Sequence, residues 1–215
     1  MVRIAHIADV HYRGLNRHDE YREVFSAFVE DARTMGVEHV FVGGDIWHTK
    51  TTGLSPEYIN EIAWWIDSLA SIGDVHLTLG NHDGNLTNVS RQDAVSPIVN
   101  LLNNPRVHLY KMSGVYQFAP GFNWCIFSLF DIEGWKLVKP VPGDINIACY
   151  HGPVWGAKTE TDWAIEEGLK IDDFRAYDFA LLGDIHKTQF LDYRIVEMEI
   201  DEADLAKYPD AEIIG

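Results

Sequence analysis

The sequence predicts an α/β protein, because apolar runs alternate with amphipathic segments along the first third of the chain. Short apolar runs begin at Arg3, Val40 and Val75, and the segments between them carry apolar residues at helical spacing. Strands that alternate with helices favour a parallel sheet. Each of these runs also ends in side chains that can bind metal, and ligands of such sheets bind beyond the carboxyl ends of the strands.

The helices have recognisable start and stop signals. The first is expected over residues 19–35, with Asp19 as its cap and a glycine after it. The second is expected over residues 55–73 and starts with Ser55 as a cap followed by a first-turn proline. The same Ser-Pro signal at Ser96 predicts a short third helix.

The second half of the chain has a different spacing. Between Val107 and Tyr150, short strands separated by turn residues predict hairpins. A helix-rich stretch is expected over residues 159–177, before a strand that starts at Phe179. Residues 194–200 alternate in polarity, which predicts a late or edge strand. We expect one domain over residues 1–200, and an acidic tail over residues 201–215 that leads to a further region.

Composition is that of an ordinary globular protein, with 47% hydrophobic and 23% charged residues among 215. No apolar stretch approaches the roughly 20 residues of a membrane span, and the start lacks the layout of a signal peptide. Cys125 and Cys149 lie in strand-like runs, where we expect buried free thiols in a reducing cytoplasm. The net charge of −16 argues mildly against tight, autonomous binding of DNA.

Five apolar runs end in metal-binding side chains, and this constellation carries the functional prediction. Five strands delivering carboxylates, imidazoles and one amide to one sheet edge would build a single pocket. Such a set suits two divalent cations, and a cation pair suits cleavage of a phosphate ester. Mixed oxygen and nitrogen ligands favour Mn²⁺, Fe or Zn²⁺ over Mg²⁺. The expected metal ligands are Asp9, His11, Asp45, Asn81, His151, Asp184 and His186.

Several residues have distinct expected roles. Asp45 follows a Gly-Gly pair and is the natural carboxylate to bridge two ions. His82 is placed to act as a general acid or to stabilise the pentacoordinate phosphorus, with Asp83 orienting its imidazole. His48 lies on the same rim and could position His82 or the phosphate, although a packing or capping role is the alternative.

Other residues that could bind metal or stack on bases are assigned to packing or to the surface. Trp64 and Trp65 are interpreted as helix-packing residues rather than a base-stacking platform. The remaining histidines are assigned to the core or the surface; they are His6, His18, His39, His76 and His108.

Taken together, the motifs resemble those of the calcineurin-like metallophosphoesterases, over residues 2–190. The Gly-Asp-x-x-His motif at Asp45 and His48 is similar to that of the SbcD-type DNA nucleases of bacteria and phages. The resemblance implies a four-layer α/β/β/α sandwich with mixed sheets. It also implies a Mn²⁺-dependent 3′→5′ exonuclease and single-strand endonuclease that acts in DNA recombination and repair. The implied partners are DNA, a coiled-coil ABC-type ATPase subunit and a second copy of the chain.

The resemblance also implies which ligands would bind each of the two metal ions. The first ion would be held by Asp9, His11, Asp45 and His186, and the second by Asp45, Asn81, His151 and Asp184. Three departures from the family pattern stand out. Asp184 replaces the usual histidine, the Gly-Ser turn expected soon after His186 is missing near Leu191, and no C-terminal capping domain follows. We expect a segment to be missing from the sequence at Leu191.

The sequence leaves three functions open. The first is a Mn²⁺-dependent SbcD-type nuclease of phage or bacterial origin, in the cytoplasm of the bacterium or host. The second is a phosphodiesterase of the same fold acting on a small molecule such as a cyclic nucleotide or a phospholipid headgroup. The acidic composition favours this second function, whereas His48 favours the nuclease. The third is a non-catalytic, metal-binding scaffold, against which the intact His82 and ligand set argue.

Overall fold

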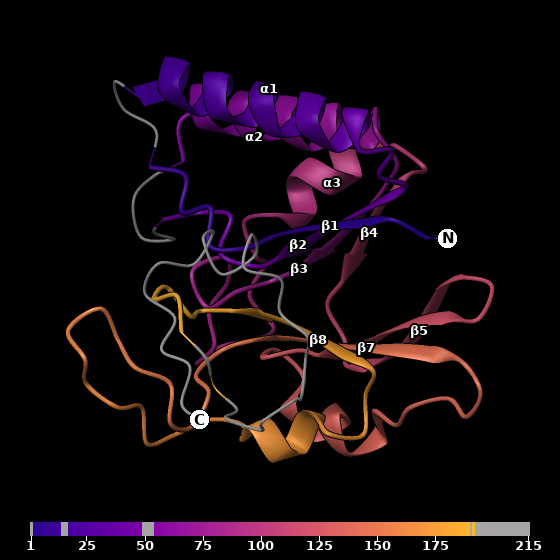
Figure 1. Ribbon diagram of the computed structural model, residues 1–215. Coiled ribbons are helices and arrows are strands. Elements are labelled where there is room, and N and C mark those ends of the chain that lie inside the picture. Colours follow the sequence, from indigo (N-terminus) through magenta and orange to yellow (C-terminus); the bar gives the residue numbers. More distant parts are fainter. Residues whose placement is uncertain (1, 14–16, 49–53, 190, 192–215) are drawn as a thin grey trace, which may run out of the picture.

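The computed structural model describes residues 2–13, 17–48, 54–189 and 191. The described chain forms two four-stranded sheets that face one another (Figure 1). Three helices cover the outer face of the first sheet, and short 3-10 helices lie below the second (Figure 1). The α/β class and the four-layer arrangement expected from the sequence are confirmed.

The first sheet is wholly parallel, in the order β1-β2-β3-β4. Its strands are β1 (Ile4–Ile7), β2 (His39–Gly43), β3 (Asp74–Thr78) and β4 (Val107–Tyr110). Because all four strands run the same way, the segments that come after β1, β2 and β3 emerge at one edge. That edge is where the sequence places its first three ligand clusters.

Helices α1 (His18–Thr34), α2 (Pro56–Ala70) and α3 (Ser96–Leu102) match the three predicted helices. The predicted cap of α2 is confirmed, because Ser55 Oγ accepts a hydrogen bond from the Tyr58 amide at 3.4 Å. The predicted cap of α1 is wrong. The helix starts one residue before Asp19, which lies in the first turn, where its charge favours the helix dipole.

The second sheet is mixed, in the order β5-β6-β7-β8. Its strands are β5 (Gly114–Ala119), β6 (Phe122–Phe127), β7 (Ile145–His151) and β8 (Phe179–Gly183). Only β5 and β6 form a hairpin, whereas β6, β7 and β8 are parallel. The expectation of hairpins throughout residues 107–150 is therefore wrong for the β6–β7 connection, and also for β4 and β5, which lie in different sheets. That connection crosses over through the 3-10 helix η2 (Ile132–Leu137).

The helix-rich stretch expected over residues 159–177 is also wrong. This region contains only the 3-10 helix η3 (Ile171–Phe174), and its first part is a folded loop closed by an antiparallel bridge between Lys158 and Ala164. Asp162 has a φ of 65°, which interrupts any helix. The expectations for residues 194–200, for the tail over 201–215 and for a missing segment at Leu191-Asp192 lie outside the described residues.

Three apolar clusters separate the four layers. The largest lies between the helices and the first sheet, and Phe25 stacks on Trp65 there with ring centroids 4.6 Å apart. The predicted packing roles of Trp64 and Trp65 are confirmed, since Trp65 is fully buried and Trp64 packs against the same cluster. A second cluster lies between the two sheets, and a third lies between the second sheet and its 3-10 helices. Cys125 and Cys149 are buried free thiols in these layers, as predicted.

The two sheets approach most closely where β2, β7 and β8 end. A Cβ atom on Gly183 would lie 2.6 Å from the Gly43 carbonyl oxygen and 2.5 Å from His151 Nδ1. Only glycine at 183 permits this approach, because real Cβ contacts are longer. The approach brings the ligand-bearing edge of the second sheet against that of the first.

A buried histidine pair between the sheets predicts loss of stability in acid. His76 Nε2 lies 3.1 Å from His39 Nδ1, and its Nδ1 lies 2.9 Å from the Tyr110 hydroxyl. Burial, with the neighbouring His108 and His39, lowers the pKa of His76 to about 3. Since the unfolded chain gains this proton near pH 6.5, the stabilising contribution is complete above 6.5 and decreases toward pH 3.

We therefore expect the free energy of unfolding to fall by about 2 kcal/mol between pH 6.5 and pH 5 through His76 alone. Urea unfolding of wild type and His76→Gln at a series of pH values is the measurement. The variant should have a shallower dependence on pH in this window. Equal slopes for the two proteins would contradict the assignment.

Candidate metal centre

The candidate ligands come directly after strands, and the backbone is strained where they do so. Asp9, His11, Asp45 and Asp184 have φ values of 55°, 45°, 52° and 68°. A positive φ is uncommon for residues other than glycine and concentrates at functional sites. The Asp9 and His11 amides donate to the carbonyl oxygens of Gly44 and Asp45 at 3.1 and 2.9 Å. These bonds fix the segments after β1 and β2 side by side.

Asp45 lies at the centre of the cluster and is 1% exposed. Its Oδ1 accepts the His82 amide at 2.8 Å. Its Oδ2 faces three imidazole nitrogens, with His151 Nε2 at 3.3 Å, His11 Nε2 at 3.7 Å and His82 Nε2 at 4.0 Å. Burial alone would raise the pKa of Asp45, but His151 and His82 lower it. Asp45 is therefore ionised and surrounded by nitrogen donors, as a shared ligand would be.

His151 is oriented by the first sheet. Its Nδ1 lies 2.6 Å from the Gly43 carbonyl oxygen, which can only accept, so Nδ1 carries a proton and Nε2 is the ligand atom. Nε2 is buried and makes no hydrogen bond to any described residue. Burial opposes a charge on this imidazole, but Asp45 and Asp9 raise its pKa to about 9. The surroundings of Nε2 thus favour positive charge.

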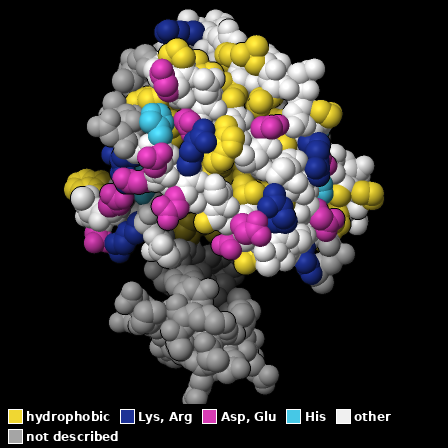
Figure 2. All heavy atoms as spheres, turned by 90° about the horizontal axis from the view of Figure 1, so that it is seen from above, with side chains coloured by type: hydrophobic (Ala, Val, Ile, Leu, Met, Phe, Trp, Pro, Cys, Tyr) yellow, Lys and Arg dark blue, Asp and Glu magenta, His cyan; other side chains and the backbone are white. Residues whose placement is uncertain are grey.

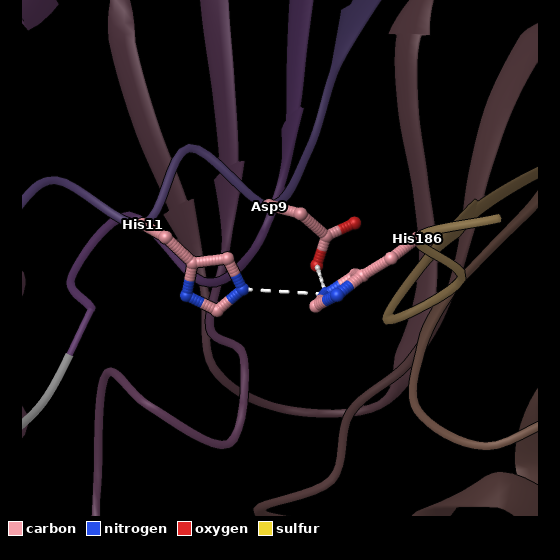
Figure 3. A group of neighbouring side chains, drawn as sticks. All are labelled: Asp9, His11 and His186. Atoms are coloured by element: carbon pink, nitrogen blue, oxygen red, sulfur yellow. Dashed lines mark hydrogen bonds and ion pairs between the residues drawn. The ribbon is translucent and has the colours of Figure 1, made fainter. Parts of the chain in front are cut away.

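Figure 3 shows a second group of ligands, formed across the two sheets by Asp9, His11 and His186. His186 Nε2 lies 3.4 Å from His11 Nε2 and 3.8 Å from Asp9 Oδ1. Two further groups share members with it: His11, Asp45 and His82, and Asp9, Asp45 and His151. Within each group the ligand atoms lie within 4.8 Å of one another. Asp9, His11 and Asp45 each belong to two groups.

Asp184 and Asn81 lie at the margin of this centre. Both line a cavity of about 600 Å³, together with His186 and residues of the loop after β7. The Asp184 amide donates to both Asp9 carboxylate oxygens, at 3.0 and 3.1 Å. Burial, with Asp45 and Asp9, raises the pKa of the Asp184 carboxyl, against the lowering effect of His151. Three carboxylates therefore compete for positive charge at this point.

The predicted partnership between Asp83 and His82 is wrong. Asp83 is fully buried, and its oxygens accept the amides of Trp47 at 3.1 Å and Gly80 at 2.9 Å. His82 Nδ1 instead hydrogen-bonds to the carbonyl oxygen of His48. Asp83 joins the loops after β2 and β3 because main-chain amides, rather than an imidazole, surround it. Its burial raises its pKa to about 7.

His48 contacts other residues of the site through its backbone as well as through its imidazole ring. Its imidazole lies beside that of His82, with centroids 6.2 Å apart and planes at 21°, and its edge faces His11 at 5.7 Å. Its amide donates to the Tyr12 carbonyl oxygen at 3.2 Å. His48 thus lies beside His82 and His11, and its carbonyl group is what positions His82.

The residues present fit a pair of divalent cations. Carboxylate oxygens and imidazole nitrogens converge from both sheets, and the buried Nε2 of His151 faces the shared carboxylate of Asp45. This set of hard and borderline donors suits Mn²⁺, Fe or Zn²⁺. Six of the predicted residues lie together: Asp9, His11, Asp45, His82, His151 and His186.

The sequence did not reveal the loop after β7 as part of the site. Lys158, Thr159, Glu160 and Thr161 line the cavity beside Asp184. Their polar side chains do not recur at the spacing of a helix or a strand, and the sequence predicts a helix in this region rather than a loop. The only sequence signal was their position soon after His151, since loops at the carboxyl ends of parallel strands carry ligand sites.

The face of the molecule that α1 and α2 cover has no large patch of one sign of charge. There, acidic and basic side chains are interspersed (Figure 2). Arg22 pairs with Glu61 at 2.8 Å and lies 4.6 Å above the ring of Trp64. None of the described helices has the length and apolar character that crossing a membrane requires.

Comparison with known proteins agrees with this geometry. The family of calcineurin-like phosphoesterases matches residues 2–188. The chain is also 38% identical over 203 residues to uncharacterized protein R555 of Acanthamoeba polyphaga mimivirus. That alignment covers 87% of this chain but only 15% of the viral protein, so the chain corresponds to a small part of its relative. With its ligand set at the edges of two sheets and a family match over nearly its whole length, the chain belongs to the calcineurin-like phosphoesterases.

Proposed function

We propose that this metal-dependent phosphoesterase is a DNA nuclease of the SbcD type. The observation that carries the proposal is the contact between His82 Nδ1 and the His48 carbonyl oxygen. The imidazole of His48, the last residue of the Gly-Asp-x-x-His motif that resembles that of the SbcD-type enzymes, also lies beside the ring of His82, with centroids 6.2 Å apart. Because the carbonyl can only accept, Nδ1 carries a proton and Nε2 is directed to the reaction; to act as a general acid His82 would carry a second proton on Nε2.

Each residue has a role in the proposed reaction. Two bound divalent ions, with Mn²⁺ as the expected metal, would supply an activated water and neutralise charge on the phosphate. Asp45 would be shared by the ions, while Asp9, His11 and His186 would complete one side and Asn81, His151 and Asp184 the other. His82 would protonate the leaving oxygen or stabilise charge at phosphorus. His48 and Asp83 are positioning residues, because they hold His82 and its loop.

The nuclease proposal carries further expectations about partners and origin. We propose action in recombination or repair together with a coiled-coil ABC-type ATPase subunit, and association of two copies of the chain. A phage or bacterial source in a cytoplasm fits this role. The acidic balance of the chain, with 33 acidic against 17 basic residues, supports the need for a partner that contributes to DNA binding.

A small-molecule phosphodiesterase is the second candidate. It is favoured by the acidic side chains in the cavity beside the centre, where Glu160 and Glu167 would repel the additional phosphates of a long strand. The non-catalytic scaffold is disfavoured, because the seven expected ligands would suffice to hold metal, whereas His82 is an additional imidazole that the His48 carbonyl oxygen holds beside Asp45.

Turnover of three substrates side by side tests the proposal. Labelled duplex DNA, labelled single-stranded DNA and bis(p-nitrophenyl) phosphate should be incubated with Mn²⁺ and, as a control, with excess chelator. We expect Mn²⁺-dependent cleavage of DNA. Cleavage of the small ester alone would favour the second candidate, and no turnover of any substrate with two bound metals would favour the scaffold.

The carboxylate at position 184 predicts a change in metal preference. Asp184 adds negative charge beside Asp9 and Asp45, which favours hard ions such as Mn²⁺ or Mg²⁺. We expect Asp184→His to shift preference toward Zn²⁺, Co²⁺ or Ni²⁺ while two ions remain bound. Each metal would be titrated into wild type and variant with phosphoester cleavage as the readout. An unchanged order of preference would show that Asp184 is not a ligand.

A further inference from the structure

The loop between β7 and η3 exposes an aromatic side chain two residues along the chain from Thr161, which lines the cavity beside the metal centre. Trp163 is 76% exposed, although it belongs to a structured turn. The loop projects from the body of the protein as the long orange excursion in Figure 1. Thr159, Glu160 and Thr161 of the same turn line the cavity that Asp184 and His186 also line. An exposed indole offers an aromatic face on which a nucleobase can stack.

The turn that carries Trp163 is held in one conformation by its own hydrogen bonds. The Trp163 amide donates to Thr159 Oγ1 at 3.2 Å, and the Thr159 amide donates to the Trp163 carbonyl oxygen at 2.9 Å. The Ile165 amide donates to the Ala157 carbonyl oxygen at 2.8 Å. The indole is therefore presented on a rigid support, which lowers the entropy lost on binding.

The loop is also fastened to the segment that carries His186. Gln189 accepts the Lys158 amide at 2.7 Å through Oε1 and donates to the Lys158 carbonyl oxygen at 2.9 Å through Nε2. Lys187 forms an ion pair with Asp162 at the tip of the turn. These two connections fix the position of the turn relative to the metal ligand.

The charge of the cavity determines what can bind there. Its described lining contains one lysine, Lys158, against Glu160, Glu167 and Asp184. Such a lining repels a second phosphate placed next to the one at the metal centre. A neutral group, such as a nucleobase with its sugar, meets no such repulsion.

We propose that Trp163 is a specificity-determining residue that stacks on a nucleobase adjacent to the scissile phosphate. The proposal rests on the nuclease function above and narrows it: the cavity would take one nucleoside that bears no further phosphate. Every base has an aromatic face, so the stack requires no base sequence. Loss of such a stack typically weakens binding roughly 5- to 150-fold.

The test uses thymidylyl-thymidine, a dinucleoside with a single phosphodiester, and two analogues in which one or the other base is replaced by a tetrahydrofuran abasic sugar. With Mn²⁺, the kcat/KM of wild type should be about 10-fold lower on one of the two abasic analogues than on the intact dinucleoside. The kcat/KM of Trp163→Ala on the intact dinucleoside should be lower than that of wild type by a similar factor. Trp163→Ala should cleave that abasic analogue no more slowly than wild type does, because the substitution and the missing base remove the same contact. Trp163→Tyr should restore most of the activity.

Phe179→Ala is the matched control, because Phe179 is 61% exposed and lies at the start of β8, the end opposite Asp184. It should change none of these rates. A terminal phosphate on the base-stacked nucleoside should lower cleavage, and Glu160→Gln with Glu167→Gln should relieve that loss.

The outcomes separate the inference from the function on which it rests. Unchanged cleavage of the dinucleoside by Trp163→Ala, with active wild type, would overturn the inference and leave the nuclease standing. Wild type that cleaves bis(p-nitrophenyl) phosphate but neither the dinucleoside nor DNA would overturn the nuclease function itself. A loss on Trp163→Ala that is equal for intact and abasic substrates would overturn the stacking inference and show a contact with something other than a base.

Discussion

Substitution of Asp45 by asparagine is expected to abolish phosphoester cleavage and to reduce the affinity for both ions. Its Oδ2 faces three imidazole nitrogens within 4.0 Å, and a neutral amide cannot replace the charge that two cations share. Changes to residues that merely orient a metal ligand cost roughly 10- to 100-fold in affinity, so loss of a shared ligand should cost more than about 100-fold. Calorimetric titration with Mn²⁺ is the measurement.

Thermal unfolding provides the control for this prediction. Asparagine can still accept the His82 amide through its side-chain oxygen, but it removes the negative charge that faces His151 Nε2 at 3.3 Å. The metal-free variant should therefore fold but be somewhat less stable than the metal-free wild type. Mn²⁺ at about 100 times its Kd should stabilise the wild type by roughly 2.7 kcal/mol per site, and the variant much less. Retention of two tightly bound ions by the variant would refute the shared role of Asp45.

Substitution of His82 by alanine or glutamine is expected to lower phosphodiester cleavage by about 10²-fold or more, the contribution typical of a positioned acid. The Nδ1 atom is occupied by the His48 carbonyl oxygen, which leaves Nε2 for the substrate. Single-turnover rates at saturating Mn²⁺ are the measurement. Metal content should remain at two ions per chain.

The structure offers a definite alternative for His82, because His82 Nε2 lies close enough to Asp45 and His11 to be a ligand itself. In that case the variants would lose an ion along with activity, and excess Mn²⁺ would restore part of the rate. Full turnover in the variants would exclude both roles. His48→Ala serves as the comparison and should have a milder effect, since the carbonyl group that positions His82 is retained.

The sequence by itself determined the α/β class and most of the candidate site. Helical periodicity and cap residues locate α1, α2 and α3, since those signals act within a few residues of each other. Asp9, with His11 two residues later, and Asp45 follow the ends of strands, and the segments at the carboxyl ends of parallel strands meet at a common edge. Local pattern was therefore sufficient to predict that Asp9, Asp45 and His151 meet.

Only the tertiary structure decided which partners these residues have. Asp83 and His82 are adjacent in sequence, yet Asp83 accepts two main-chain amides and His82 contacts a carbonyl oxygen 34 residues away. The parallel crossover from β6 to β7 and the folded loop around Trp163 likewise depend on contacts between segments distant in sequence. The helix and strand propensities of neighbouring residues cannot predict such contacts. The free energy of these contacts comes from burial and hydrogen bonds that exist only once the two sheets have packed.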